Sequence, residues 1–198
     1  MKISVITVCF NSSLTIARTL RSVRDQTYNN IEHIIVDGAS VDDTLKIIES
    51  ERSSILKVVS EKDRGIYDAM NKGVGLATGD VVAFLNADDF YKDVNVLARV
   101  AAAMQADQLD AAYGDVEFFR PSRPDTVVRL YNSGRFSVAR LGWGWMPAHP
   151  ALFVRRVLFE RYGLFSIDYC IAGDFEFIAR VFSDPKLRYR YLPASLVC

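Results

Sequence analysis

The sequence predicts an α/β fold built on a mostly parallel sheet with helices on both faces. The first observation is an alternation over about the first 115 residues: short apolar runs rich in β-branched residues are followed by segments with apolar residues at helical spacing. Such strand–helix–strand units form right-handed crossovers that bury both faces of a sheet. The second observation is the composition, since 198 residues that are 50% apolar suffice for one sizeable core.

Strands and helices are expected to alternate strictly in this first part. Strands are predicted at 3–9, 33–36, 56–60, 81–85 and 111–119. Helices are predicted from the apolar spacing between Leu14 and Val23, between Leu45 and Ile48, between Ile66 and Val74, and from Val94 to Gln105. Residues 11–13 and 42–43 offer N-caps for the first two helices, and Gly79 ends the third.

The pattern changes after residue 119. An exposed loop is predicted at 120–125, and an irregular aromatic stretch at 131–150 could cover a site. Helices are predicted at 155–162 and 175–182, before a last strand at 192–198. We expect one domain over 1–198, with halves at 1–119 and 120–198, and we expect the natural chain to continue beyond residue 198.

The net charge of zero combines two halves of opposite sign. Residues 1–119 carry 12 Lys and Arg against 18 Asp and Glu, a net of −6, and residues 120–198 carry +6. This distribution argues against a uniformly basic protein that binds nucleic acid. The three cysteines fit buried thiols in a reducing compartment, and no apolar run is long enough to span a membrane. We expect a cytoplasmic protein, or one attached at most to a membrane surface.

Polar segments follow three of the predicted strands. Asn11-Ser12, Asp37 to Ser40 and Asn86 to Asp89 come after the first, second and fourth strands, whose carboxyl ends meet at one edge of the sheet. Two adjacent carboxylates in a crevice repel each other, and oxygen ligands suit Mg²⁺ or Mn²⁺. The alternative is that these aspartates form turns and helix caps.

Four further side chains are candidates for a site. Arg64 stands at a helix start, where the helix dipole disfavours a cation, so it could contact an anion or a base. Lys72 is four residues after Asp68 and pairs with it by default. Asp174 is either a general base or the cap of the last helix. A single histidine such as His149 is more often structural than catalytic.

Missing motifs exclude several chemistries. The sequence has no Gly-x-Ser-x-Gly, His-Glu-x-x-His, Walker-type or Cys-x-x-Cys motif. The turn after the first strand, residues 9–13, contains no glycine, so a dinucleotide could not approach a helix N-terminus there. A dehydrogenase that binds such a cofactor is therefore not expected.

Taken in order, the segments of this chain resemble the inverting family 2 glycosyltransferases, which have the GT-A fold. The similar segments are Ile3 to Asn11, Ser22 to Tyr28, Ile34 to Ser40, Asp63 to Gly73 and Asn86 to Asp89. The last segment stands where the family has its Asp-x-Asp metal and nucleotide motif. Two positions depart from the family: Asn86 replaces the first Asp of that motif, and Gly38 stands where many members have a second Asp.

The resemblance implies a GT-A-like, nucleotide-binding sheet with a smaller acceptor-side region. It implies transfer of a sugar, with inversion, from a nucleotide-diphosphate sugar to an acceptor hydroxyl in cell-surface polysaccharide or glycolipid synthesis. It places at the nucleotide sugar Asn11, Asp37, Arg64, Lys72, Asn86, Asp88 and His149. It makes Asp88 and Asp89 ligands of a divalent metal, Mg²⁺ or Mn²⁺, and Asp174 the catalytic base.

The expected acceptor is a glycan or a lipid-linked molecule. The arginines of residues 120–198 suit an anionic acceptor, such as a lipid-linked diphosphate sugar at the cytoplasmic face of the membrane. Two alternatives stay open from the sequence: a nucleotide-sugar-binding module without turnover, and a nucleotidyltransferase.

Overall fold

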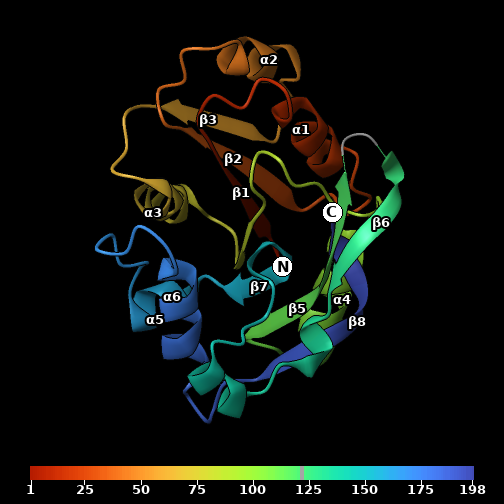
Figure 1. The fold of residues 1–198 in the computed structure, drawn as a ribbon, viewed down its shortest axis with the longest axis vertical. Helices are drawn as coiled ribbons and strands as arrows, with labels where there is room; N and C mark the ends of the chain where they lie inside the picture. The colour runs from red at the N-terminus through yellow and green to blue at the C-terminus, as the bar shows by residue number, and fades with distance from the viewer. Residues whose placement is uncertain (121–122) are drawn as a thin grey trace.

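A mixed sheet runs through the whole molecule, with helices on both faces (Figure 1). The computed structural model describes residues 1–120 and 123–198. Along the chain the elements are β1 (Ile3–Cys9), α1 (Ile16–Arg24), β2 (Ile31–Asp37), α2 (Thr44–Ser50), β3 (Leu56–Ser60), α3 (Ile66–Leu76), β4 (Val81–Phe84), α4 (Val96–Ala106), β5 (Ala111–Arg120), β6 (Arg123–Tyr131), the 3₁₀ turns η1 (Ser133–Arg135), η2 (Val138–Trp143) and η3 (His149–Ala151), β7 (Leu152–Arg155), α5 (Val157–Tyr162), α6 (Gly173–Phe182) and β8 (Tyr189–Val197).

The first half of the chain builds the parallel part of the sheet. Its strands lie in the order β3-β2-β1-β4, and each neighbouring pair is parallel. Every residue of β1, β2 and β4 is buried. β4 is a continuous apolar run, as expected for a strand buried on both faces, whereas β2 also buries Glu32, His33 and Asp37. The fold class expected from the sequence is confirmed.

The second half extends this sheet with β6 and β7, which the sequence did not predict, and with β8, which corresponds to the strand predicted at 192–198. β7 pairs antiparallel with β4 on one side and with β5 on the other, while β8 pairs parallel with β5. The loop expected at 120–125 is wrong from Arg123 onward, because β6 begins there and pairs with β5. Prolines favoured the loop interpretation, but an edge strand such as β6 tolerates them. Residues 121–122 lie outside the described residues.

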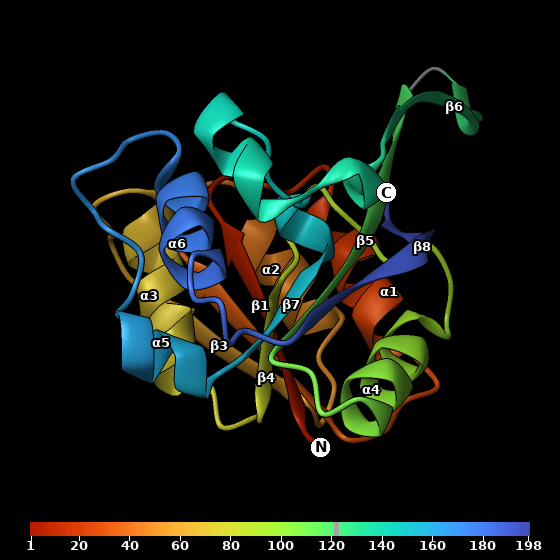
Figure 2. The ribbon, with the colours of Figure 1, turned by 90° about the horizontal axis from the view of Figure 1, so that it is seen from below.

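The helices divide between the two faces of the sheet, as Figure 2 shows. α3, α5 and α6 cover one face, and α1, α2 and α4 cover the other. Leu14, expected on the buried face of the first helix, is 98% exposed because α1 begins only at Ile16. Among the described residues, none of the helices has the length and apolar character needed to cross a bilayer.

Aromatic rings hold α5 and α6 against the end of β4. The rings of Phe159 on α5 and Phe177 on α6 stack with centroids 4.5 Å apart. Phe165 lies 4.8 Å from Phe177 and 5.3 Å from Phe84 of β4. This cluster fixes the start of α6 beside the carboxyl end of the parallel strands. Of the thiols expected to be buried, Cys9 and Cys198 are, whereas Cys170 is exposed.

Candidate active site

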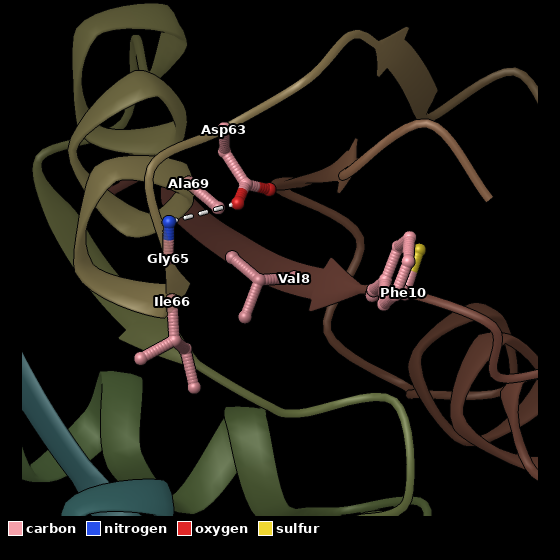
Figure 3. Close-up of a pocket in the computed structure, with 7 residues that line it drawn as sticks. Val8, Phe10, Asp63, Gly65, Ile66 and Ala69 are labelled. Atoms are coloured by element: carbon pink, nitrogen blue, oxygen red, sulfur yellow. Dashed lines mark hydrogen bonds between the residues drawn. The ribbon is translucent and has the colours of Figure 1, made fainter. Parts of the chain in front are cut away.

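A pocket of about 280 Å³ opens at the carboxyl end of β1. Figure 3 shows Val8 and Ile66 at its floor, the Phe10 ring at one side and the Asp63 carboxylate at the opposite edge. Phe10 is 61% exposed although it directly follows a fully buried strand. An exposed ring facing apolar side chains offers a stacking surface for a flat ligand.

Asp63 is a residue of this pocket that the sequence interpretation missed. Its Oδ1 accepts the backbone N–H of Gly65 at 3.0 Å, which orients the carboxylate at the pocket edge (Figure 3). A Cβ on Gly38 would lie 2.6 Å from Asp63 Oδ2, so only glycine leaves room for this placement. The glycine at position 38, where many family members have an aspartate, therefore leaves room for the Asp63 carboxylate. Asp63 is the first residue of the family-like segment Asp63 to Gly73.

Asp37 lies behind the pocket rather than in its wall. The residue is 0% exposed, and its carboxylate accepts hydrogen bonds from Ser40 N at 3.0 Å, from Ser40 Oγ, and from Ser60 Oγ at 2.7 Å. The Cys9 thiol donates to it at 3.6 Å, and burial together with the Asp37 charge raises the pKa of that thiol. These contacts join the ends of β1, β2 and β3 and fix the loop after β2.

Asn11 ties the loop after β1 to the loop after β2. Its backbone N–H donates to Ser40 Oγ at 2.8 Å, and its Oδ1 accepts the N–H of Val41 at 3.0 Å. Asn11 and Ala39 both have positive φ, of 50° and 63°. Residues 11–13 therefore organise the edge of the sheet, and α1 has no side-chain cap. The prediction that these residues cap the first helix is wrong.

Arg64 and Lys72 both contact Asp68 on α3. The Arg64 guanidinium lies 3.3 Å from the Asp68 carboxylate, and its side chain is 72% exposed. Lys72 Nζ lies 3.7 Å from Asp68, as the helical spacing predicted, and 2.9 Å from Glu61. Glu61 raises the pKa of Lys72, so this ammonium stays charged. Both cations lie next to the Asp63 pocket, and neither side chain lines it.

Three adjoining hollows form a continuous trough along this edge of the sheet. The Asp63 pocket shares Val8, Phe10 and Ile66 with a second hollow of about 550 Å³. The second shares Leu14, Thr15 and Asp88 with a third of about 470 Å³, which reaches Asp89, Arg18 and Cys198. We call this the edge trough, and its main lining residues are Val8, Phe10, Leu14, Thr15, Asp63, Ile66, Asn86, Asp88 and Asp89.

Asp88 and Asp89 have different surroundings although they are neighbours. Asp88 is exposed to the trough, whereas burial, followed by the Asp88 charge, raises the pKa of Asp89 to about 7. The Oδ1 atom of Asn86 is buried and has no hydrogen-bond partner among the described residues. The helix-cap alternative for these aspartates is wrong, since α4 begins at Val96 after Asn95.

The donor atoms of this loop fit Mg²⁺ or Mn²⁺. Asn86 Oδ1 is an oxygen left without a partner, and the carboxylates of Asp88 and Asp89 repel each other until a cation is present. Within the described residues, no three His, Cys, Asp or Glu side chains form a ready metal cluster. A hard cation that takes one or two carboxylates and completes its shell with phosphate and water matches this set.

Side chains of α1 and of the segment just after it form hydrogen bonds with the loop between β4 and α4. The Thr19 hydroxyl, on a residue 1% exposed, reaches Ala87 O at 3.0 Å and Asp89 O at 2.7 Å. Gln26 donates to Asp93 O at 2.8 Å, and its Oε1 accepts the N–H of Leu97 at 3.0 Å. Thr19 lies on α1, and Gln26 follows two residues after the end of this helix at Arg24. The sequence predicted this helix from its apolar residues and gave no reason to single out these two.

Asp174 lies in the first turn of α6, beside the edge trough. Its Oδ1 accepts a hydrogen bond from Tyr67 Oη at 3.0 Å, and Tyr67 directly follows Ile66 of the trough. A Cβ on Gly173 would lie 2.8 Å from the Tyr67 ring, so glycine permits this close approach. The cap alternative for Asp174 is wrong, because Ala172 occupies that position and α6 has no side-chain cap.

His149 lies on the same side, stacked on Phe84 with ring centroids 5.3 Å apart. Burial lowers its pKa, while the Asp174 charge acts in the opposite direction. Its Nε2 is buried without a hydrogen-bond partner among the described residues, as is Asn86 Oδ1. A ligand bound near the end of β4 could supply a hydrogen-bond partner for both atoms.

Known proteins share both the sequence and the fold of this chain. The model of glycosyl transferase family 2 matches residues 4–163. A PGL/p-HBAD biosynthesis glycosyltransferase of Mycobacterium tuberculosis is 36% identical over 196 residues, which cover 96% of this chain and 73% of the relative. An uncharacterized glycosyltransferase of the same species is 33% identical over 180 residues, covering 90% of this chain and 68% of the relative.

Solved structures with the same fold have lower sequence identity. TarS 1-349 of S. aureus, which was also solved in complex with UDP-GlcNAc, has a TM-score of 0.85 at 22% identity. This chain is covered completely and spans 60% of the TarS chain. The mannosyltransferase PcManGT of Pyrobaculum calidifontis, in complex with GDP-Man and Mn²⁺, has a TM-score of 0.74 at 23% identity, covering 97% of this chain and 55% of its own. The sheet order agrees with the GT-A fold of these enzymes, and the family model together with the mycobacterial relatives shows that the chain belongs to glycosyltransferase family 2.

Proposed function

We propose that this chain transfers a sugar from a nucleotide-diphosphate sugar to an acceptor hydroxyl with inversion at the anomeric carbon. The observation that carries the proposal is the juxtaposition of the edge trough, which has the Asp88–Asp89 pair on its wall, with Asp174 beside it on α6. The family and the fold support transfer of a sugar. The placement of a carboxylate beside the trough supports a single displacement.

The nucleoside fits the Asp63 pocket in this proposal. Phe10 offers a face for the base, and the Asp63 carboxylate can accept a hydrogen bond from a base N–H. Asp37 and Asn11 hold the surrounding loops, and Arg64 and Lys72 provide positive charge at the rim. TarS with UDP-GlcNAc and PcManGT with GDP-Man support a nucleotide sugar as the donor.

The diphosphate would then lie along the trough toward Asn86, Asp88 and Asp89, which we propose as the residues that hold a divalent metal. A bound Mg²⁺ or Mn²⁺ would supply charge neutralisation for the departing nucleoside diphosphate. Thr19 fixes the backbone of this loop, so the carboxylates keep their positions whether or not the donor is bound. The amide of Asn86 contributes an oxygen without adding a third negative charge.

Asp174 is the proposed base. The acceptor oxygen attacks the anomeric carbon, the bond from that carbon to the diphosphate oxygen breaks, and the acceptor proton passes to Asp174. Tyr67 donates to Oδ1 of Asp174, which orients the carboxylate and leaves Oδ2 to receive the proton. A positioned base of this kind contributes about 10²–10⁴-fold to the rate. His149, packed near Asp174 with an unsatisfied Nε2, is the proposed polar contact to the sugar.

The cellular role follows from the relatives. We propose glycolipid synthesis, since the curated mycobacterial relatives are named for PGL/p-HBAD biosynthesis. In this proposal the protein works in the cytoplasm and contacts the inner membrane face only peripherally. Residues 1–119 hold the donor, and residues 120–198 supply the base and the acceptor side.

A donor panel tests the function. The protein is incubated with UDP-, GDP- and dTDP-sugars, with and without Mn²⁺, and the released products are measured. Metal-dependent release of nucleoside diphosphate from one donor is the expected result. Release of pyrophosphate instead would make the chain a nucleotidyltransferase, and tight donor binding without any product would make it a binding module.

A further inference from the structure

A separate pocket of about 490 Å³ lies on the other side of Asp174, outside the edge trough. It opens between the end of β6, the turn after η2 and the start of α6. Its lining residues are Tyr131, Gly144, Met146, Ile171, Ala172, Asp174 and Phe175. None of these residues belongs to the parts of the sheet that hold the proposed donor. Apart from Asp174, the lining residues carry no charge.

The walls of this pocket are apolar. Met146 and Phe175 are half-buried and pack against the aromatic core beneath. The Tyr131 hydroxyl donates to Met146 O at 2.8 Å, so the polar end of this side chain is already satisfied inside the protein. Ile171 is 84% exposed, which is unusual for a large aliphatic side chain next to a charged carboxylate. An apolar cavity with one charged group at its wall is typical of a ligand site rather than of a solvated surface.

The pocket meets the edge trough at one pair of side chains. Asp174 belongs to the pocket, and it accepts a hydrogen bond from Tyr67, whose neighbour Ile66 lines the trough. A molecule seated in the pocket would therefore have a hydroxyl within reach of the Asp174 carboxylate. That is the position that the acceptor occupies in the proposed reaction.

We propose that this pocket binds the acceptor through an apolar aryl or alkyl group attached close to the reacting hydroxyl. This inference rests on the proposed function. Burial against Tyr131, Met146 and Phe175 favours an apolar group, and the Asp174 charge disfavours an anionic one. Two arginines close in sequence to the lining are already engaged in local contacts: Arg129 lies 5.4 Å from the Phe118 ring centroid, and Arg140 donates to the Arg135 carbonyl at 2.8 Å and lies 5.9 Å from the Trp145 ring centroid.

The chain contains a natural reporter for this pocket. Its two tryptophans, Trp143 and Trp145, flank Gly144 of the lining. Their fluorescence is followed while the protein, without donor, is titrated with phenyl β-D-glucoside, n-hexyl β-D-glucoside or methyl β-D-glucoside. We expect at least one of the two apolar glucosides to bind tenfold or more tightly than the methyl compound. Equal binding of all three would overturn the proposal.

A charged substitution localises the effect. Ile171→Glu places a second negative charge in the pocket, and we expect it to weaken binding of the apolar glucoside at least tenfold. Val157→Glu is the matched control, because Val157 is 52% exposed on α5 and does not line the pocket. Unchanged thermal unfolding midpoints show that both variants fold. If Ile171→Glu binds the apolar glucoside as tightly as the control does, the pocket is not the acceptor site.

The donor panel keeps the two proposals separate. Release of nucleoside diphosphate combined with no preference for apolar glucosides would overturn the acceptor inference and leave the transferase intact. Apolar preference that is lost in Ile171→Glu, combined with no product from any donor, would confirm the pocket as a binding site and contradict the proposed function.

Discussion

Asp37 is buried, whereas Asp63 lines the pocket at the end of β1. The two carboxylates therefore have different roles. Asp37 accepts hydrogen bonds that join three strand ends, whereas Asp63 directs its carboxylate along the rim of the pocket at the end of β1. The resemblance to the family placed Asp37 at the nucleotide sugar. The side chains that surround it, from Ser40 and Ser60, come from separate segments, and their convergence cannot be read from spacing.

Replacing each carboxylate by an amide tests the two roles separately. Asp37→Asn is expected to lower the free energy of unfolding by about 1–3 kcal/mol, because a buried acceptor is replaced by a donor among donors. Asp63→Asn retains Oδ1 and the fold, and is expected to raise the KM for the donor roughly tenfold. Urea unfolding and donor kinetics measure the two effects. An Asp63→Asn enzyme with an unchanged donor KM would show that Asp63 does not touch the base.

His33 makes the stability of the fold depend on pH. It is 2% exposed, its Nε2 lies 2.9 Å from Thr7 Oγ1, and burial lowers its pKa from 6.5 to about 3. Below pH 6.5 the unfolded chain takes up a proton there and the folded chain does not. The folded state therefore loses about 1.4 kcal/mol per pH unit as the pH falls toward 3. This contribution is fully present above pH 6.5.

The matched variant isolates that contribution. Between pH 7 and pH 5, urea unfolding of the wild type is expected to lose about 2 kcal/mol more than His33→Gln, which has no titrating ring. Parallel pH dependences of the two proteins would mean that His33 is protonated in the folded state as readily as in the unfolded chain.

At the scale of elements, α1 both packs the sheet and supports the candidate metal loop. Ile16, Leu20 and Val23 are buried on its apolar face, which the sequence predicted. The Thr19 hydroxyl of this helix and the Gln26 amide just beyond its end contact the loop between β4 and α4. Apolar periodicity identifies the helix, but it does not show which polar side chains will meet a loop about 70 residues away.

Thr19→Val tests this support. It keeps the shape of the side chain and removes the hydroxyl that contacts Ala87 O and Asp89 O. The concentration of Mn²⁺ that gives half-maximal activity is expected to rise roughly three- to tenfold, as the loss of about one hydrogen bond implies. Thr27→Val is the control, since Thr27 donates to Val94 O at the far end of the loop. An equal effect of both substitutions would mean a general loss of stability.

The elements that the sequence predicted are those with a local signal. Continuous β-branched runs identified β1 and β4, and apolar spacing identified α3 and α6. β7 is only four residues long and gains its place from partners on two sides, so no local pattern marks it. The contact of Tyr67 with Asp174 joins residues 107 positions apart, which spacing cannot reveal.

For the whole molecule, the opposite charges of the two halves are partly matched within the fold. Five arginines of the basic half pair with acidic residues: Arg156 with Glu160, Arg161 with Asp184, Arg180 with Glu176, Arg188 with Asp110 and Arg190 with Asp107. The last two pairs join the halves. Each exposed pair contributes about 0–1 kcal/mol to the free energy of unfolding. These ion pairs therefore affect the orientation of the two halves more than the stability of the fold.

Because one sheet joins the two halves, we expect them to unfold as one cooperative unit. β7 of the second half lies between β4 and β5 of the first, so neither half completes the sheet alone. Both tryptophans lie in the second half, whereas far-UV circular dichroism reports on the whole chain. The urea transitions followed by fluorescence and by circular dichroism are expected to coincide. Loss of the tryptophan signal at lower urea would show that the second half unfolds separately.

The account depends most on Asp174 as the base of the transfer, and one comparison tests it directly. Sugar transfer is measured with the active donor for the wild type, Asp174→Asn and Glu176→Gln. Glu176 is an acidic residue of the same helix turn that pairs with Arg180 and does not line the acceptor pocket. Asp174→Asn is expected to transfer about 10²–10⁴ times more slowly with unchanged donor binding, and Glu176→Gln about as fast as the wild type. Transfer by Asp174→Asn at the wild-type rate would contradict the account.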